Sequence, residues 1–427
     1  MLRAHLLLPV VLTLNLLTGL SHAQTPRSKD RVQGWSADID FLLDQAAKQH
    51  YVYKSKPLPE KLVEGAVSLK KSIPDFSDER MLAELQRLIS TLGDGHSYVL
   101  PFGAEYVHST WLPVRFYLFS DGLFIIDAQP GYEQWIGSKV VRIGGISATT
   151  AIARVGGMIS EDNSMGTKWI GPILLGFRGV LEAVGAAPMS DTLVLSLVDP
   201  KGHKQDVSLP YVPVPRMRGL PKLIASKSPP AEATPLYLSN VSTTYWFKEL
   251  SDGRAIYFQF NQVADAHNES LSAYAHRLDE FLTAKPHQLL VIDVRHNNGG
   301  NADLLPPLLQ TVKKFESNNP QAKIVVITGR NTFSAAQIFI NLMSRETKAI
   351  FAGEPSSSKP NFVGEENQIV FPWSGALGSI SNRYHESMPG DNRQWIEPQI
   401  KIELSSRDYF AGRDPVLDTV TKLPKLN

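Results

Sequence analysis

The chain has 427 residues and is almost neutral, with 43 Lys and Arg against 42 Asp and Glu. This balance gives no reason to expect a polyanion such as nucleic acid as a partner. Hydrophobic residues make up 43% of the chain and charged residues 20%, which excludes a disordered protein and indicates a globular one. There is no cysteine, which excludes disulfides, thiolate metal sites and a catalytic cysteine, so any nucleophile must be an oxygen or a nitrogen.

The first residues predict an export signal. Arg3 gives a positive start, an apolar run follows from Leu6 to Leu20, and the small residues Ser21 and Ala23 suit a signal peptidase. The run is shorter than the roughly 20 apolar residues that a membrane span needs. We therefore expect residues 1–23 to be a cleaved signal peptide, with no stable membrane span after its removal and a mature protein in the periplasm or outside the cell.

The next part of the chain divides into three regions. Apolar residues recur at three and four positions from Trp35 to Leu92, which predicts a helical cap over 24–100. Short β-branched and aromatic runs with Asp-Gly and Gly-Gly turns predict a β-rich module over 101–215. Pro, Lys and Ser then dominate a predicted linker over 216–235.

Strands and helices alternate in the last third of the chain. Continuous apolar strands between amphipathic helices are typical of a largely parallel sheet that is covered on both faces. The elements are expected in this order: strand 255–260, helix 271–281, strand 289–294, helix 304–315, strand 324–328 and helix 335–343. The predicted fold class is therefore α/β, within a multidomain α+β chain.

Familiar catalytic signatures are missing. The chain has no Gly-x-Ser-x-Gly, Gly-x-x-x-x-Gly-Lys-Ser/Thr, Gly-x-Gly-x-x-Gly or His-Glu-x-x-His motif. Its 11 histidines form no pair with the spacing of metal ligands. We expect neither a metal nor another cofactor.

Paired glycines follow the strand at 289–294. This strand runs out into Asn297, Asn298, Gly299 and Gly300 before the next helix begins. Glycines let backbone N–H groups approach a ligand closely, and N–H groups at a helix start attract an anion or an oxyanion. The alternative is an ordinary turn.

A serine marks the next strand-to-helix junction. Ser334 directly precedes the helix expected at 335–343. A hydroxyl at this position lies at the positive end of the helix dipole, which favours an alkoxide and a tetrahedral oxyanion, and the N–H of Ala335 points the same way. Alternatively, Ser334 or Thr332 is only the N-cap of the helix. The spacing does not decide between these interpretations.

Five motifs together resemble a known family. In chain order they are Gly93-Asp-Gly-His-Ser-Tyr-Val, Ile292-Asp-Val-Arg-His-Asn-Asn-Gly-Gly, Thr328-Gly-Arg-Asn-Thr-Phe-Ser-Ala-Ala, Gly353-Glu-Pro-Ser-Ser-Ser-Lys-Pro-Asn-Phe-Val-Gly-Glu and Asp408-Tyr-Phe-Ala-Gly-Arg-Asp-Pro-Val-Leu-Asp. They resemble the tail-specific serine peptidases, a family that includes the C-terminal processing proteases and the tricorn core protease. The resemblance implies a Clp protease/crotonase-like α/β spiral core over 236–427, flanked by the helical cap and by the β-rich module, whose residues 139–145 resemble the end of a degenerate PDZ-type module.

The resemblance also implies roles for single residues. Ser334 falls on the family's nucleophile, and the N–H groups of Ala335 and Gly300 fall on its oxyanion hole. Two residues are candidates for the base. Processing proteases use a lysine, and Lys359 lies 25 positions after Ser334 in the matching loop; such a lysine must be desolvated to lose its proton near neutral pH. Tricorn-like members use a histidine, and His96 lies on that motif, where an imidazole needs little tuning.

The chain departs from both patterns. After the lysine, Pro360 and Asn361 replace the expected glycine, and Val363 takes the place of an orienting glutamine. In the tricorn-type motif, Gly95 replaces a serine.

The loop is closer to family members without the processing-protease loop, so we prefer His96 as the base. Lys359 is then available to bind a substrate carboxylate. Glu365 and the neighbouring Glu366 are candidates for the acid that orients the base. Three further predictions concern structure: Trp373, Trp395 and Tyr409 are core aromatics rather than a substrate pocket, Asp293 and Arg295 organise the junction below the glycines, and Arg413 and Asp414 form a structural ion pair.

The sequence thus predicts an exported serine peptidase that cleaves envelope or secreted proteins or peptides through an acyl-enzyme on Ser334. The main alternative is a weakly active or inactive protein that binds peptides or hydrophobic ligands on the same scaffold. The missing glutamine and serine favour that alternative, whereas the glycine pair, Ser334 and His96 oppose it. An esterase for small acyl substrates uses the same residues.

Overall fold

The computed structural model describes residues 30–187, 190–214, 234–250 and 253–423. The predicted signal peptide and nearly all of the predicted linker lie outside these residues. None of the helices in these ranges combines the length and the apolar character that crossing a membrane requires. The chain divides into two compact units. Of the described residues, the C-terminal unit contains 234–250, 253–360 and 387–423, and the N-terminal unit contains 30–187, 190–214 and 361–386.

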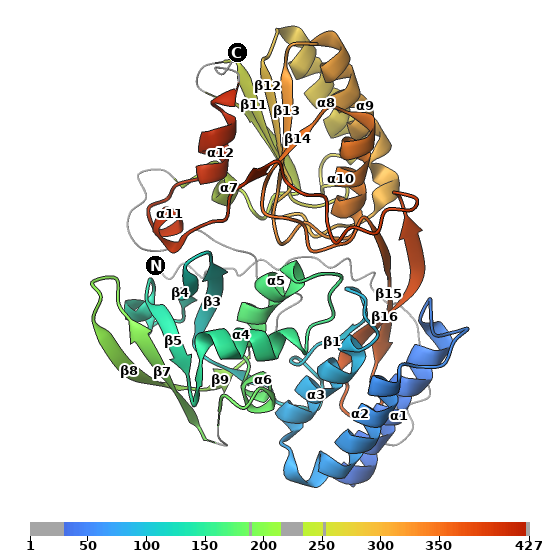
Figure 1. Cartoon of the computed structure of the whole chain (residues 1–427), viewed down its shortest axis with the longest axis vertical. Helices are drawn as coiled ribbons and strands as arrows, with labels where there is room; N and C mark the ends of the chain where they lie inside the picture. The colour runs from blue at the N-terminus through green and yellow to red at the C-terminus, as the bar shows by residue number, and fades with distance from the viewer. Residues whose placement is uncertain (1–29, 188–189, 215–233, 251–252, 424–427) are drawn as a thin grey trace. The chain divides into compact units, whose positions relative to one another are not determined.

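A six-stranded sheet lies at the centre of the described part of the C-terminal unit (Figure 1). The strands lie in the order β10 (Tyr245–Glu249), β11 (Ala255–Phe260), β12 (Leu289–Asp293), β13 (Lys323–Thr328), β14 (Ile350–Gly353) and β17 (Ile400–Lys401). Only β10 is antiparallel to its neighbour; the other pairs are parallel. Strands β11, β12 and β13 are almost wholly buried, as expected for a parallel sheet with both faces covered.

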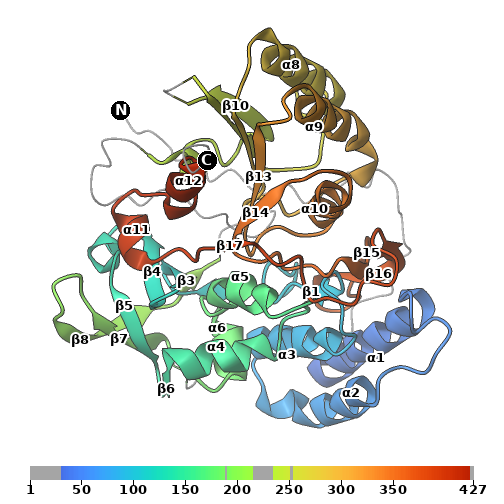
Figure 2. The same cartoon turned by 45° about the horizontal axis from the view of Figure 1, so that its top comes forward.

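Helices cover the two faces of this sheet. On one face lie α8 (Leu271–Ala284), α9 (Pro306–Asn318) and α10 (Ala335–Glu346), with the short helix η3 (Ala302–Leu304) before α9. On the other face lies α12 (Pro415–Val420), and Figure 2 shows these helices on opposite sides of β13 and β14. The short helices α7 (Leu236–Ser239) and α11 (Ser406–Phe410) belong to the same unit. The predicted α/β class and the predicted order of strands and helices are confirmed.

Three helices form the start of the N-terminal unit, as their apolar spacing predicts. They are α1 (Arg31–Gln49), α2 (Glu60–Ser72) and α3 (Asp78–Ser90), with η1 (Ile73–Asp75) between the last two. Helix α3 begins where Ser77 caps it by accepting the N–H of Arg80 at 3.0 Å.

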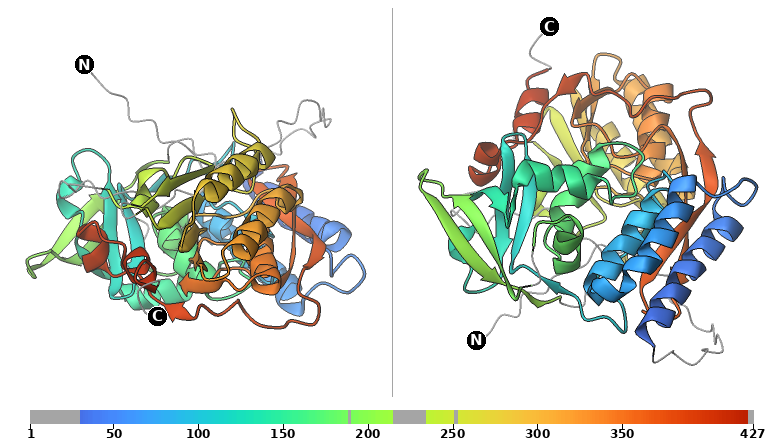
Figure 3. Two further views of the ribbon diagram at one scale, coloured as in Figure 1. Left: turned by 90° about the horizontal axis from the view of Figure 1, so that it is seen from above. Right: turned by 60° about the horizontal axis from the view of Figure 1, so that its bottom comes forward.

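The segment 361–386 departs from the predicted division, which places it in the region 236–427. It forms a hairpin of β15 (Asn361–Val370) and β16 (Leu377–Glu386), and β16 pairs with β1 (Tyr98–Val99). Its aromatic residues join the core of α1 to α3; the ring of Trp373 packs against that of Trp35 with centroids 5.0 Å apart. Figure 3 shows the hairpin beside the blue helices. Apolar burial therefore assigns this segment to the N-terminal unit.

A second sheet of the N-terminal unit confirms the predicted β-rich character of the middle of the chain. Its strands lie in the order β3 (Val114–Phe119), β4 (Gly122–Ala128), β5 (Lys139–Ile143), β7 (Thr192–Val198) and β8 (Lys204–Pro210), with β6 (Ile146–Ser147) beside β5. The pair β2 (Thr110–Trp111) and β9 (Val212–Pro213) and the turn η2 (Glu133–Trp135) complete the described strands and turns here. Helices α4 (Ala148–Gly156), α5 (Met165–Leu174) and α6 (Arg178–Ala183) are additions to the expected module.

Candidate active site

Ser334 has an unusual backbone at the start of α10. Its φ is 55° and its ψ is −123°, and among the described residues other than glycine only Glu365 shares a positive φ. Such a conformation costs about 1–3 kcal/mol and persists only where the surroundings hold it. The Ser334 side chain makes no capping hydrogen bond. The interpretation of Ser334 as only an N-cap is therefore wrong, and its hydroxyl is not used by the helix.

Thr332 is not the cap either. Its hydroxyl donates to the carbonyl of Val294 at 2.9 Å and accepts the N–H of Gly329 at 3.1 Å. The hydroxyl therefore closes the turn between β13 and α10 and ties it to the end of β12. Ser334 is half-buried, and its hydroxyl is used neither by this turn nor as a cap of the helix.

The two strand-to-helix junctions meet, because the carboxyl ends of the parallel neighbours β12 and β13 lie at one edge of the sheet. The N–H of Phe333 donates to the carbonyl of Asn297 at 3.1 Å. The buried Asn297 amide is itself fixed, since it donates to the carbonyl of Phe260 at 3.0 Å and accepts the N–H of Gly299 at 3.0 Å. The turn that carries the glycines is thus anchored beside the serine.

The contacts of the glycine turn leave the N–H of Gly300 available for a ligand. Gly299 uses its N–H on Asn297, and Asn301 donates to the carbonyl of Val263 at 2.8 Å. Among the described residues, neither the N–H of Gly300 nor that of Ala335, the first residue of α10, finds an acceptor. Both N–H groups remain the predicted donors of an oxyanion hole.

Lys359 belongs to the same unit as Ser334 and lies in a loop that contacts it. The hydroxyl of Ser358 accepts the N–H of Ser334 at 3.0 Å, and the N–H of Ser357 donates to the carbonyl of Thr332 at 3.0 Å. Lys359 is half-buried and makes no ion pair with any residue that the structure describes. The structure therefore brings Ser334, Ala335, the glycine turn and the lysine loop together.

His96 belongs to the N-terminal unit, in the turn between α3 and β1. The carboxylate of Asp94 accepts the N–H of His96 at 2.8 Å and that of Ser97 at 2.6 Å, and the N–H of Gly95 donates to Asp162 at 3.0 Å. The imidazole is buried and stacks on Phe362 with centroids 5.3 Å apart. Burial lowers the pKa of His96 to about 4, against the opposing charge of Asp94. The ring is therefore neutral at pH 7, the form that a general base needs.

His50 and Asp94 form a buried pair that the sequence did not predict. His50 accepts the N–H of Val52 on Nδ1 at 3.2 Å, so Nε2 carries the hydrogen and donates to Asp94 at 3.0 Å. Burial raises the pKa of Asp94, but hydrogen bonds from His50 and Ser381 outweigh it, and the pKa is lowered overall. The Gly-Asp-Gly-His motif contains Asp94, whereas a single histidine at the end of α1 gives no signal of its own.

Glu365 also belongs to the N-terminal unit. Its exposed carboxylate lies 3.5 Å from Arg383 and 3.6 Å from Nε2 of His385. His385 stacks on the ring of Phe362, the same ring on which His96 stacks. The orienting role of Glu365 stays a prediction.

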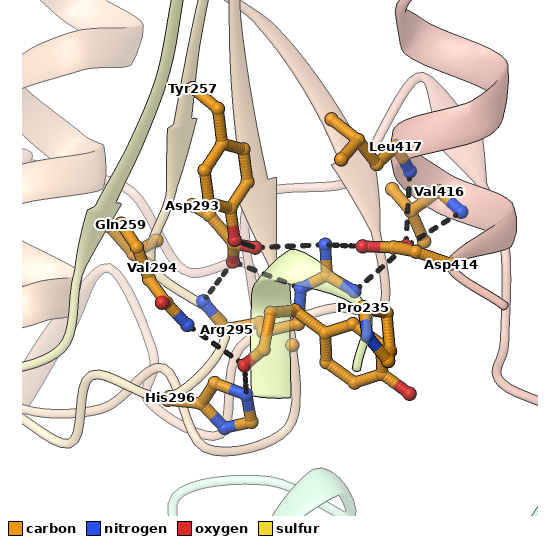
Figure 4. Close-up of polar contacts among 12 residues, drawn as sticks. Pro235, Tyr257, Gln259, Asp293, Val294, Arg295, His296, Asp414, Val416 and Leu417 are labelled. Carbon is orange, nitrogen blue, oxygen red and sulfur yellow. Dashed lines mark hydrogen bonds and ion pairs between the residues drawn. The ribbon is translucent and has the colours of Figure 1, made fainter. Parts of the chain in front are cut away.

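A buried charge cluster lies at the end of β12, just before the glycine turn in the chain (Figure 4). Arg295 contacts Asp293 at 2.9 Å and Asp414 at 2.9 Å, and the hydroxyl of Tyr257 donates to Asp293 at 2.6 Å. Asp293 and Arg295 therefore contact each other at this junction, and their role in organising it stays a prediction.

The predicted ion pair between Arg413 and Asp414 is wrong. The carboxylate of Asp414 caps α12 by accepting the N–H of Val416 and that of Leu417, and faces Arg295 (Figure 4). Arg413 instead pairs with Asp408 at 2.6 Å.

The three aromatic residues that were expected in the core have different surroundings. Trp373 and Tyr409 are buried, which confirms their prediction as core residues. Trp395 is only half-buried and donates to the carboxylate of Glu397 at 2.6 Å.

Comparisons with known proteins agree with the motifs. No protein-family model matches the chain. The tricorn protease of Thermoplasma acidophilum is 23% identical over an alignment of 167 residues, and the match covers 32% of this chain and 14% of that protein. The chain therefore spans only about a seventh of this relative.

Solved structures of CPAF match nearly the whole chain. Mature CPAF complexed with lactacystin aligns with a TM-score of 0.64 at 15% identity, over 92% of this chain and 98% of CPAF. A serine-to-alanine mutant of CPAF aligns with a TM-score of 0.63 at 13% identity, over 92% and 97%. The chain therefore has the fold of CPAF, and together with the sequence relationship to the tricorn protease this confirms the resemblance to the tail-specific serine peptidases that the motifs predict.

Proposed function

We propose that this chain is an exported serine peptidase that hydrolyses peptide bonds of envelope or secreted proteins or peptides. Ser334 is the nucleophile, and the N–H groups of Gly300 and Ala335 bind the oxyanion. His96 is the preferred base and Lys359 the alternative. No metal or other cofactor takes part in this proposal.

The backbone of Ser334 is the observation that carries the proposal. A serine that only caps a helix has an extended backbone, and its hydroxyl oxygen accepts an N–H of the first turn. Ser334 has a positive φ and no capping bond. Holding a side chain in a strained conformation is a property of reactive sites, where the strain presents the group to a substrate.

The chemistry follows from the groups at hand. The Ser334 oxygen attacks the carbonyl carbon of the substrate while the base accepts its proton, and the two N–H groups stabilise the negative charge on the carbonyl oxygen. The base then gives the proton to the leaving amine. Water hydrolyses the acyl-enzyme in a second step of the same kind. One such N–H donor typically contributes a factor of about 10² to 10³ in kcat.

Covalent labelling tests the proposal. The mature protein is treated with a fluorophosphonate, and the labelled residue is located by mass spectrometry in the wild type and in Ser334→Ala, His96→Ala and Lys359→Ala. We expect a label on Ser334 that is lost in Ser334→Ala and in one of the two base variants, which then names the base. A folded wild type that stays unlabelled at every pH favours the binding protein on the same scaffold.

Two further measurements separate the finer parts of the proposal. Turnover of peptides against p-nitrophenyl esters distinguishes a peptidase from an esterase. Fractionation of cells that express the full chain, with N-terminal sequencing of the product, tests export and removal of residues 1–23.

A further inference from the structure

The loop 354–360 is fastened to the inner face of α10 by side chains. Ser356 donates to the amide oxygen of Gln337 at 2.6 Å, Gln337 donates to Asn341 one turn further on at 2.8 Å, and Asn341 donates to the carbonyl of Pro360 at 2.8 Å. Gln337 and Asn341 are wholly buried. Because buried amides need partners, these bonds set the position of the loop along the helix.

The start of the same loop is fixed by a buried ion pair. Glu354 accepts from the guanidinium of Arg330 through both carboxylate oxygens, with Nε and Oε2 at 2.8 Å. The carbonyl of Glu354 accepts the hydroxyl of Thr328 at 2.7 Å. Both bonds join the loop to the segment that leads into Ser334. The loop is thus held at its beginning by the strand end and at its end by the helix.

Ser358 lies between these two anchors and reaches the candidate nucleophile. Its side chain is fully buried, and its hydroxyl oxygen accepts the N–H of Ser334 at 3.0 Å. The N–H groups at a helix start have no acceptor within the helix. Without Ser358, the part-buried N–H of Ser334 loses this acceptor.

We propose that Ser358 is a positioning residue for Ser334: its buried hydroxyl holds the Ser334 amide and so keeps the serine in its positive-φ conformation with the side chain turned away from the helix. The proposal rests on the proposed function of Ser334 as a nucleophile. The Gln337–Asn341 pair and the Arg330–Glu354 pair act one step further out, since they hold the loop from which Ser358 extends.

The competing conformation is an ordinary helix cap. If the Ser334 backbone relaxes to a negative φ, its hydroxyl can accept the N–H of Gln337, the usual target of a capping serine. A capping hydroxyl is no longer presented to a substrate. Loss of Ser358 is therefore expected to reduce the reactivity of Ser334 more than it reduces the stability of the fold.

The chain offers a matched control in the neighbouring residue. Ser357 is also buried, but its hydroxyl has no hydrogen-bond partner among the described residues. Its backbone N–H donates to the carbonyl of Thr332, a bond that a change of side chain leaves intact. Ser357→Ala and Ser358→Ala thus delete the same atom from the same loop, and only the second removes a bond to Ser334.

The test compares two properties of Ser334 in the full mature chain. The first is the rate of its modification by a fluorophosphonate, which we expect to fall about three- to tenfold in Ser358→Ala, the range for loss of one hydrogen bond, and to stay unchanged in Ser357→Ala. The second is hydrogen exchange of the Ser334 amide, which we expect to speed up by a similar factor in Ser358→Ala alone. Ser358→Thr keeps the hydroxyl and is expected to restore both.

The outcomes separate this inference from the function on which it rests. A wild type that is never labelled contradicts the nucleophile, and the exchange of the Ser334 amide then still decides whether Ser358 holds it. A labelled wild type with equal labelling and equal exchange in the two alanine variants overturns the role of Ser358. If Ser358→Thr does not fold, the comparison of Ser357→Ala with Ser358→Ala remains decisive.

Discussion

The backbone of Gly299 lies directly against Ser334: a Cβ at Gly299 would be 2.7 Å from the Cβ of Ser334 and 3.0 Å from the amide nitrogen of Ala335. Both neighbours are parts of the candidate site, and the second is backbone that cannot move aside. We expect Gly299→Ala to displace Ser334 and to lower its rate of fluorophosphonate labelling by at least about a hundredfold, since displacements of about 1 Å have effects of this size. The labelling rate measures the effect on the reactivity of Ser334, and thermal unfolding measures the effect on the stability of the fold.

Gly202→Ala is the control for this substitution. Gly202 also has a positive φ, of 91°, but a Cβ there meets no atom within 4 Å. It therefore carries only the backbone cost of a positive φ, about 1 kcal/mol, without a clash. Labelling of Ser334 is expected to be unchanged in Gly202→Ala. An equal loss of labelling in Gly299→Ala and Gly202→Ala would show that the close approach of Gly299 to Ser334 does not control the reactivity of the serine.

The strained backbone of Ser334 predicts how substitutions at this position affect the stability of the fold. Glycine adopts a positive φ freely, whereas alanine keeps the strain, so Ser334→Gly is expected to be more stable than Ser334→Ala by about 1 kcal/mol. Both variants are expected to be inactive. Ser344, in the last turn of the same helix, is the control. Ser344→Gly is expected to be less stable than Ser344→Ala, because glycine in a helix is less favourable than alanine by up to about 1 kcal/mol. Denaturant unfolding of the four variants measures both differences; the same sign at both positions argues against strain at Ser334.

The sequence predicts much of the C-terminal unit because its signals are local. Continuous apolar strands between amphipathic helices predict a parallel sheet, and a parallel sheet brings the ends of β12 and β13 to one edge. The meeting of Gly299 with Ser334 follows from that geometry. The pairing of β16 with β1 is different, since it joins residues 98 and 379 and depends on core packing that no short window of sequence contains.

Side-chain hydrogen bonds within the site are harder still to predict. The loop contains three consecutive serines with different roles. The hydroxyl of Ser356 donates to Gln337, that of Ser357 has no partner among the described residues, and that of Ser358 accepts from Ser334. Only the path of the loop over α10 separates them. The burial that sets the pKa of His96 is likewise a property of the folded unit rather than of the motif.

The buried imidazole of His96 predicts how stability and activity depend on pH. Burial lowers its pKa from the ordinary value of 6.5 to about 4. Between these values the unfolded chain binds a proton that the folded chain does not, so the free energy of unfolding falls as the pH is lowered, by up to about 3 kcal/mol over this window. His96→Gln is expected to flatten this part of the stability curve, and an unchanged slope in that variant contradicts the prediction.

The same shift affects catalysis if His96 is the base. The neutral ring persists down to a pH of about 4, so the acidic limb of kcat/KM is expected near pH 4 rather than near 6.5. A pH profile of peptide hydrolysis, or of Ser334 labelling, locates this limb. A limb near 6.5 would mean that the ring is solvated in the reacting enzyme, and full labelling in His96→Ala would transfer the role to Lys359.

The contact between Arg295 and Asp414 predicts a large effect from a residue near the end of the chain. The Asp414 side chain is only 4% exposed and lies 2.9 Å from the guanidinium of Arg295. Removing one partner of a buried pair leaves the other charge poorly compensated, and Asp414 also caps α12. We expect Asp414→Ala to lower the free energy of unfolding of the C-terminal unit by about 3 kcal/mol. We also expect it to slow labelling of Ser334, because Arg295 lies in the turn that leads to the glycines.

Arg413→Ala separates this effect from a general weakening of the chain near its end. Arg413 pairs with Asp408, and their side chains are 49% and 24% exposed. An exposed pair is screened by water and contributes at most about 1 kcal/mol, so this neighbouring substitution is expected to leave Ser334 labelling unchanged. Denaturant unfolding measures the free energy of unfolding of each variant. The rate of Ser334 labelling is measured separately, at a pH where both variants are folded. Equal losses of stability in Arg413→Ala and Asp414→Ala would contradict this prediction. They would mean that Asp293 alone compensates the buried charge of Arg295.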